Sequence, residues 1–188
     1  VLENVELLEH HPTFLGLAEK YKNVPAFIVG AGPSLGKNID LLAQAKRKGI
    51  VFAVNTSARA LAGKGITPQV LACMESIDLA HLLEKLPFID EVVRAISLTA
   101  HPSTARTGKG PLLPVYEGLP QLSPLGALGR APGLSVCGSV STLAFSLAQR
   151  LGCSPIVFVG QDLAYTGGDA YAAGTAYEGS KVRLSADG

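Results

Sequence analysis

The chain has 188 residues, of which 47% are hydrophobic and 16% are charged, and 16 Lys plus Arg nearly balance 15 Asp plus Glu. This composition can bury a core and excludes a disordered chain. A net charge of +1 excludes the broad basic surface that holds nucleic acid or anionic lipid, so we expect neither nucleic acid nor membrane as a partner. The sequence has no apolar run of transmembrane length, no signal-peptide pattern and only three cysteines. These features predict a cytoplasmic protein.

Two regions differ in their patterns. Residues 1–23 carry short helical turns interrupted at Pro12, and we expect them to be a lead-in helical segment that belongs to an upstream region. Residues 24–188 are predicted to form a nucleotide-binding α/β domain. We expect the whole sequence to be a fragment of a longer protein.

Short apolar runs alternate with helical patterns along residues 24–159. The predicted strands cover residues 26–29, 50–54, 70–74, 92–98, 113–116 and 156–159. The predicted helices cover residues 39–48, 56–62, 79–83 and 139–151. Residues 100–133 are rich in proline and glycine and show no sustained period, which is typical of a functional or mobile segment apart from the short edge strand.

The predicted strands lack polar alternation, which indicates burial on both faces of the sheet. Their alternation with helices predicts a doubly wound, mainly parallel, Rossmann-like α/β sheet. Ligands of such sheets bind at the carboxyl ends of the strands, so the polar residues there are the candidates for a site.

The first predicted strand runs into a glycine turn that contains Gly30, Gly32, Pro33 and Ser34. Glycines allow a positive φ and close approach of a ligand, and the following helix offers free N–H groups to an anion. A phosphate or nucleotide site is the favoured interpretation, and a plain tight turn is the alternative. The dinucleotide fingerprint fails because Leu35 stands where its third glycine belongs, and a Walker A loop does not fit either.

Polar residues follow the next two strands as well. Asn55 ends the second strand and could contact a base or ribose, or could cap the helix that follows. Glu75 and Asp78 follow the third strand and could bind a metal or hydroxyl groups, although a helix cap is the favoured role of Asp78.

A second anion site is predicted where the long helix 139–151 begins. Gly138, Ser139 and Thr142 lie at this N-terminus, where simple capping by Ser139 is an equal alternative. The last strand runs into Gln161, Asp162 and Tyr165. Asp162 could bind a metal, orient a hydroxyl or bond a neighbouring loop, and a functional role is favoured.

These motifs resemble a known family when they are taken in order. The motifs are Gly30-Ala31-Gly32-Pro33-Ser34-Leu35, Gly65-Ile66-Thr67-Pro68, Gly138-Ser139-Val140 and Val159-Gly160-Gln161-Asp162-Leu163-Ala164-Tyr165-Thr166. The chain from about residue 24 to residue 173 resembles the central domain of the Maf motility-associated glycosyltransferases. That domain is grouped with the MptE-like hydroxymethylpterin pyrophosphokinases.

The resemblance implies a function and a donor. Maf proteins are linked to the transfer of nonulosonic acids from a CMP-sugar to Ser or Thr of flagellin. The domain is similar to bacterial sialyltransferases, whose glycine loop and second-strand Asn contact CMP, and this role carries over to Gly30, Gly32, Pro33, Ser34 and Asn55. The MptE-like branch instead implies transfer of pyrophosphate from ATP to a pterin, with Mg²⁺.

Two residues depart from the pattern of this family. Gln69 stands where an Asp is usual, and Tyr171 stands where a His is common. The missing His would be a natural general acid or base, so Tyr165 or Tyr171 would have to replace it.

Three hypotheses follow for the function. The first is a nucleotide-sugar glycosyltransferase with Asp162, Glu75 and Tyr165 as catalytic residues, and with the glycine turn, Asn55, the start of helix 139–151 and Gln161 binding the nucleotide. The second is a pyrophosphokinase whose Mg²⁺ would be held by Glu75, Asp78 and Asp162. The third is a non-catalytic module that binds a nucleotide or a partner protein.

Overall fold

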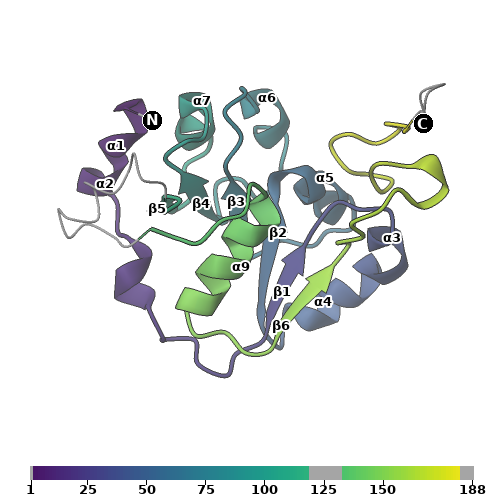
Figure 1. Ribbon diagram of the computed structural model, residues 1–188, viewed down its shortest axis with the longest axis horizontal. Helices are drawn as coiled ribbons and strands as arrows, with labels where there is room; N and C mark the ends of the chain where they lie inside the picture. Colours follow the sequence, from purple (N-terminus) through teal and green to yellow (C-terminus); the bar gives the residue numbers. More distant parts are fainter. Residues whose placement is uncertain (1, 119–132, 183–188) are drawn as a thin grey trace.

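A computed structural model describes residues 2–118 and 133–182 (Figure 1). In these residues six parallel strands form one sheet in the order β5-β4-β3-β2-β1-β6. The strands are β1 (Ala26–Val29), β2 (Ile50–Val54), β3 (Val70–Cys73), β4 (Val93–Ser97), β5 (Leu112–Val115) and β6 (Ile156–Val159). The predicted parallel α/β sheet is therefore confirmed. The chain runs outward from β1 to β5 and then returns to the other side of β1, so the strand order reverses between β1 and β6.

Helices cover both faces of the sheet, as the two-sided burial of its strands requires. Helix α9 (Val140–Arg150) packs against one face, in a core that includes Ile28, Phe52 and Leu143. Shorter helices line the opposite face in a second core that includes Leu61 and Leu71. These helices are α3 (Leu35–Asn38), α4 (Leu42–Ala45), α5 (Asn55–Gly63), α6 (Ala80–Leu83) and α7 (Pro102–Arg106). No helix in the described ranges is both long and apolar enough to cross a membrane.

Two predicted segments differ in detail from the structure. The helix expected over residues 39–48 is instead the 3₁₀ turn η2 (Ile39–Leu41) followed by α4, which ends at Ala45. The additional short helix α3 precedes them and is separated from η2 by Asn38, whose φ of −123° is not helical. Residues 100–133 are not uniformly irregular. Pro102 occupies the first turn of α7, and the His101 side chain accepts the Ser103 N–H, which together start a helix there. The edge strand expected near residue 113 is confirmed as β5, and residues 119–132 lie outside the described residues.

The prediction that all strands are buried on both faces is wrong for β6. This strand lies at the edge of the sheet, where Val157 is 39% exposed and Phe158 is 44% exposed. Phe145 of α9 stacks on Phe158 with a centroid distance of 5.7 Å, which covers only part of the strand. An uninterrupted apolar run does not reveal that its strand lies at an edge.

The N-terminal segment packs against the sheet. It contains α1 (Leu2–Val5), α2 (Leu7–His10) and the 3₁₀ turn η1 (Phe14–Leu17). Leu8 and Phe14 belong to the same core as α9, and Phe14 is only 1% exposed. The Asn4 amide donates to the carbonyls of Leu98 and Ala100, at 3.2 and 2.7 Å. This segment therefore stabilises the side of the sheet that carries β4 and β5.

We predict that Phe14→Ala lowers the free energy of unfolding by about 3–5 kcal/mol, because it removes a buried aromatic ring and leaves a cavity. Chemical denaturation of the purified chain measures this change. Leu15→Ala in the same turn is the matched control, since Leu15 is 42% exposed and its loss should cost about 0.5 kcal/mol or less. Equal costs for the two variants would show that the N-terminal segment does not share the core.

Candidate functional site

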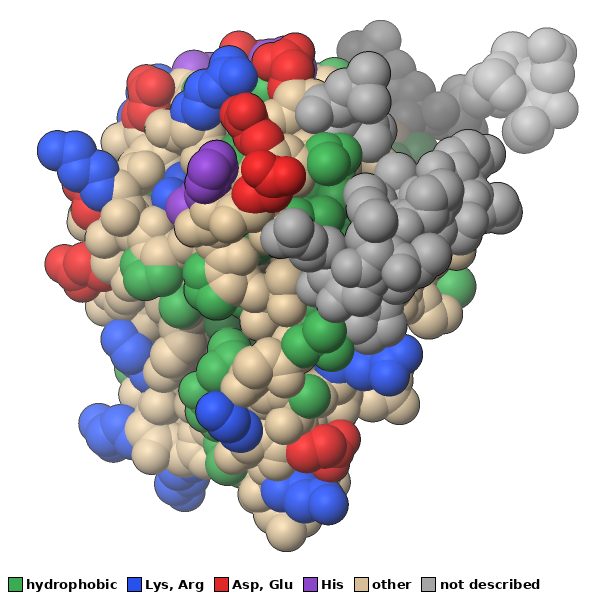
Figure 2. All heavy atoms as spheres, turned by 90° about the vertical axis from the view of Figure 1, so that its left-hand side faces the viewer, with side chains coloured by type: hydrophobic (Ala, Val, Ile, Leu, Met, Phe, Trp, Pro, Cys, Tyr) green, Lys and Arg blue, Asp and Glu red, His purple; other side chains and the backbone are tan. Residues whose placement is uncertain are grey.

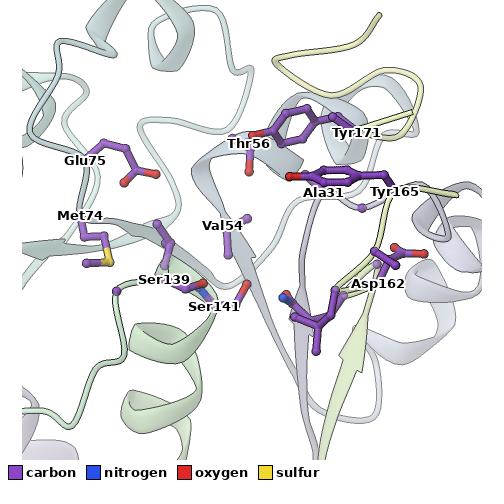
Figure 3. A pocket seen from close by; sticks show the side chains of 18 of the residues that line it. Ala31, Val54, Thr56, Met74, Glu75, Ser139, Ser141, Asp162, Tyr165 and Tyr171 are labelled. Carbon is purple, nitrogen blue, oxygen red and sulfur yellow. The ribbon is translucent and has the colours of Figure 1, made fainter. Parts of the chain in front are cut away.

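A cavity of about 880 Å³ opens at the carboxyl ends of β1, β2, β3 and β6 and at the N-terminus of α9 (Figure 3). It includes the point where the strand order reverses, which is where ligands of doubly wound sheets bind. The register explains why these loops meet, because Val29 of β1 pairs with both Ala53 of β2 and Val159 of β6. The loops after β1, β2 and β6 therefore leave the sheet side by side.

The glycine turn after β1 is shaped by its neighbour, the loop after β6. A Cβ added to Gly30 would lie 2.6 Å from the Gly160 carbonyl oxygen, and one added to Gly32 would lie 2.1 Å from an Asp162 carboxylate oxygen. The Gly32 N–H also donates to the Gly160 carbonyl at 2.8 Å. Neither Gly30 nor Gly32 has a positive φ. These glycines are therefore needed because two loops pass very close to each other, a reason that differs from the backbone conformation expected from the sequence.

Asp162 bonds to the backbone and side chain of Ser34. Its carboxylate accepts the Ser34 N–H at 3.1 and 3.2 Å and the Ser34 hydroxyl at 2.8 Å. Hydrogen bonds to a charged carboxylate are among the stronger ones in proteins. The Asp162 carboxylate thus occupies the position at the glycine turn where the sequence predicted a bound phosphate. It also links the loop after β6 to the start of α3.

Half-buried Glu75 and buried Asn55 form a polar pair at the ends of β3 and β2. Burial raises the pKa of Glu75, and hydrogen bonds from the Asn55 side chain and the Met74 backbone partly oppose this shift. Asn55 is 8% exposed and is the first residue of α5, which has no side-chain cap, so the alternative of a capping role does not hold. Asn55 Oδ1 and Glu75 Oε2 are buried and have no hydrogen-bond partner among the described residues. Two buried acceptors without donors favour a ligand that brings hydroxyl or amino groups.

The N-terminus of α9 borders the same cavity. Ser139 caps the helix, since its hydroxyl accepts the Ser141 N–H at 3.2 Å. The Thr142 hydroxyl donates to the Ser139 carbonyl and accepts the Cys137 N–H, which fixes the turn that leads into the helix. The positive end of an 11-residue helix therefore faces the cavity.

The segment after β6 folds back over α5 and brings two tyrosines to the cavity. The Ala172 N–H donates to the Ala31 carbonyl at 2.9 Å, and the Ala176 N–H donates to the Thr56 carbonyl at 3.1 Å. Tyr165 and Tyr171 line the cavity on the side of Thr56 (Figure 3). Tyr165 is 65% exposed, so its ring remains accessible to a ligand.

About half of the residues predicted for the site line this cavity. The lining residues among them are Gly32, Glu75, Gly138, Ser139, Gln161, Asp162 and Tyr165. The other predicted residues lie behind the lining and support it or serve another element, and they are Gly30, Pro33, Ser34, Asn55, Asp78 and Thr142. The lining also includes residues that were not predicted from the sequence, although each lies within four residues of a predicted site residue: Thr56, Met74, Ser76, Ile77 and Ser141.

The two departures from the family pattern lie at different ends of the sheet. Gln69 precedes β3, where its side chain accepts the Val51 N–H at 2.8 Å and donates to the Lys46 carbonyl at 3.4 Å. This position is at the amino ends of the strands, away from the cavity. Tyr171 lines the cavity, so only this departure bears on the chemistry of the site.

The comparisons with known proteins agree with this architecture. A family model described as 6-hydroxymethylpterin diphosphokinase MptE-like matches residues 1–168. The chain belongs to the MptE-like family. A solved structure of a MAf glycosyltransferase from Magnetospirillum magneticum AMB-1 has the same fold, with a TM-score of 0.67 and 23% identity. The match covers 76% of the present chain and 23% of the Magnetospirillum chain. A search of curated proteins gives no significant match.

The Mg²⁺ implied by a diphosphokinase does not fit the predicted ligands Glu75, Asp78 and Asp162. Among the described residues, no group of three or more His, Cys, Asp or Glu is placed to hold a metal. Asp162 is bonded to Ser34, and Asp78 accepts the Ala80 N–H at 2.9 Å and the Ser103 hydroxyl at 2.6 Å. Asp78 therefore bonds the first residue of α6, but the N-cap of that helix is Leu79 and not Asp78, and the three carboxylates are not gathered at one metal site.

We predict that Gly32→Ala destabilises the chain by about 1–3 kcal/mol, because the new Cβ forces the Asp162 loop away from β1. Urea denaturation measures the loss. Gly36→Ala in α3 is the matched control, since nothing lies within 4 Å of its Cβ, and it should be neutral or slightly stabilising. A Gly32→Ala variant as stable as Gly36→Ala would contradict the close packing of the two loops.

A second prediction concerns how Glu75 affects the stability of the chain at different pH values. Because its pKa is raised in the folded state, the folded chain binds this proton more tightly than the unfolded chain, and stability falls as the pH rises from about 4.5 through the folded pKa. Glu75→Gln should remove this fall and be more stable than the parent chain at pH 7.5. Guanidinium denaturation at several pH values between 4.5 and 8 tests it. Glu84→Gln, at an exposed position, should leave the fall unchanged.

Proposed function

We propose that the chain is a transferase domain that binds the nucleotide of a nucleoside monophosphate sugar and transfers the sugar to a hydroxyl group. The observation that carries this proposal is the charge of the cavity. Among the described residues its lining includes the carboxylates of Glu75 and Asp162 and no Lys, Arg or His. A triphosphate needs several cationic partners, whereas the single phosphate of a CMP-sugar needs one modest source of positive potential.

The N-terminus of α9 supplies that potential. Ser139, Val140 and Ser141 line the cavity at this helix end, and a helix N-terminus is a general binding site for phosphate. The phosphate of the donor is assigned to this end because Asp162 already occupies the glycine turn. Asp162 is then a positioning residue that holds the turn, in place of the catalytic role expected from the sequence.

Glu75 is the proposed general base for the acceptor hydroxyl. A raised pKa brings a carboxylate nearer to neutral pH, which makes it a better proton acceptor in the transition state. Its Oε2, which has no hydrogen-bond partner among the described residues, is matched to a hydroxyl group of a sugar. Asn55 does not line the cavity and supports Glu75 from behind it. The hydroxyls of Tyr165 and Tyr171 remain the candidates for proton transfer to the departing phosphate.

The finer identity of the substrates rests on the resemblance to Maf proteins. It includes a CMP donor, a nonulosonic acid, a protein Ser or Thr such as that of flagellin as the acceptor, and action in the cytoplasm. The structural neighbour is itself described as a glycosyltransferase, which supports the same class of reaction.

The second candidate is a pterin diphosphokinase, which the description of the family model favours. It would have to bind ATP with Mg²⁺ in a cavity whose described lining offers no cation. Binding experiments therefore separate the two candidates and also the non-catalytic module.

Thermal unfolding with CMP, UDP, ATP with Mg²⁺, and ATP with EDTA tests the proposal. CMP at 100 times its Kd should stabilise the chain by about 2.7 kcal/mol, and EDTA should not change this. A shift with ATP that requires Mg²⁺ would favour the diphosphokinase instead. No shift with any of these ligands would leave a non-catalytic module.

Two substitutions at one position locate the phosphate. Ser139→Asp and Ser139→Asn both preserve a good helix cap, but only Asp places a negative charge at the phosphate position. Ser139→Asp should lose the shift with CMP, and Ser139→Asn should keep most of it. Equal shifts in the two variants would show that the phosphate does not bind at α9.

A further inference from the structure

A second cavity, of about 360 Å³, lies on the side of the molecule that carries the N-terminal helices. It is enclosed by α1, α2, α7 and the residues before β5, and it shares no lining residue with the first cavity. Its volume falls near the lower end of the range of about 300–1,000 Å³ that is usual for small-molecule sites. Figure 2 faces this side of the molecule and shows acidic, basic and histidine side chains gathered in its upper part.

The cavity contains a buried arginine, Arg94 of β4, which is 4% exposed. Its Nη1 donates to the carbonyls of Ala105 and Thr107, and its Nη2 donates to the Gly110 carbonyl at 2.8 Å. Its Nε is buried and has no hydrogen-bond partner in the described part of the chain. Three of the five N–H donors of the guanidinium are therefore used, all of them by neutral carbonyl groups.

No carboxylate of the described residues forms an ion pair with Arg94. Burial lowers the pKa of Arg94, and the nearby Cys73 and Asp90 partly oppose this shift. A buried cation without a bonded anion is costly, by several kcal/mol in general. The cost falls when an anion is supplied.

The remaining charges around the cavity also favour an anion. Arg106 is paired with Glu3 at 3.2 Å, so these two side chains largely cancel. The other charged side chains that line the cavity are Lys109 and Glu6, and His11 lies beside them. Together with Arg94 they leave one positive charge without a counter-charge among the side chains that line the cavity. The Asp90 carboxylate accepts the backbone N–H of Lys109 at 2.7 Å from outside this lining, and among the described residues it forms no ion pair with Arg94 or Lys109.

We propose that this cavity binds a phosphate oxyanion, either as free phosphate or as a small phosphate ester, with Arg94 at its base and Lys109 at its rim. The guanidinium suits this ligand because its planar set of N–H donors matches the oxygen atoms of phosphate. The site is separate from the proposed transferase site and does not depend on it.

Titration with inorganic phosphate, followed through backbone amide NMR signals at constant ionic strength, tests the proposal on the whole chain. Saturable shifts are expected at Gly108, Lys109 and Gly110. Shifts confined to Gly138 and Ser139 would mean that phosphate uses only the first cavity, and this would overturn the proposal. Glycerol phosphate forms a parallel arm, and tighter binding than phosphate would identify an ester as the ligand.

Matched variants test the roles of the two cations. Lys109→Ala should weaken phosphate binding by about fivefold, which corresponds to a loss of roughly 1 kcal/mol, and Arg94→Met should abolish it. Lys85→Ala removes one exposed lysine that does not line this cavity, and it should leave the affinity for phosphate unchanged. Equal weakening by Lys109→Ala and Lys85→Ala would indicate non-specific attraction only and would overturn the site. Because Arg94→Met could unfold the chain, the comparison of the two lysine variants decides the question independently.

Discussion

The bonds between Asp162 and Ser34 hold together the two loops on which the cavity depends. They join the loop after β1 to the loop after its neighbour, the edge strand β6, at the point where the strand order reverses. The close approach of these loops leaves no room for a Cβ at Gly30 or Gly32. The segment after β6 continues from this junction over α5 and carries Tyr165 and Tyr171 to the cavity. The Asp162 carboxylate therefore fixes this wall of the site together with the backbone hydrogen bonds of Gly32 to Gly160 and of Ala172 to Ala31.

This arrangement also decides where positive potential remains for a ligand. The glycine turn would ordinarily offer the N–H groups at the start of α3 to a phosphate, but Asp162 accepts the Ser34 N–H in its place. The start of α9 is the other helix N-terminus in the lining, and no anionic side chain bonds to it among the described residues. The sheet thus presents two potential anion positions, of which one is filled by the protein and one is left for a ligand.

Much of the fold could be predicted from the sequence, because apolar runs and helical periods are local properties. All six strands and α9 were placed within a residue or two by these patterns. The exposure of β6 and the bonding of Asp162 could not be predicted, since both depend on which strands become neighbours. The same limit applies to the site. Glu75 could be identified because it follows a predicted strand, and Ser139 because it precedes a predicted helix. The roles of Gly32 and Asp162 depend on a contact between residues 130 positions apart.

Glu75 and Asn55 show how the stability of this fold and the use of its cavity are related. A buried carboxylate oxygen and a buried amide oxygen without donors destabilise the folded chain in the absence of a ligand. A Gln at position 75 and an apolar residue at position 55 would avoid much of this cost. Buried groups that are unsatisfied in this way are typical of functional sites, where a ligand completes the hydrogen bonds. Of the two residues only Glu75 lines the cavity, and Asn55 lies behind it. In the proposed function Glu75 therefore meets the acceptor hydroxyl, and Asn55 holds the Glu75 carboxylate in place by bonding to it.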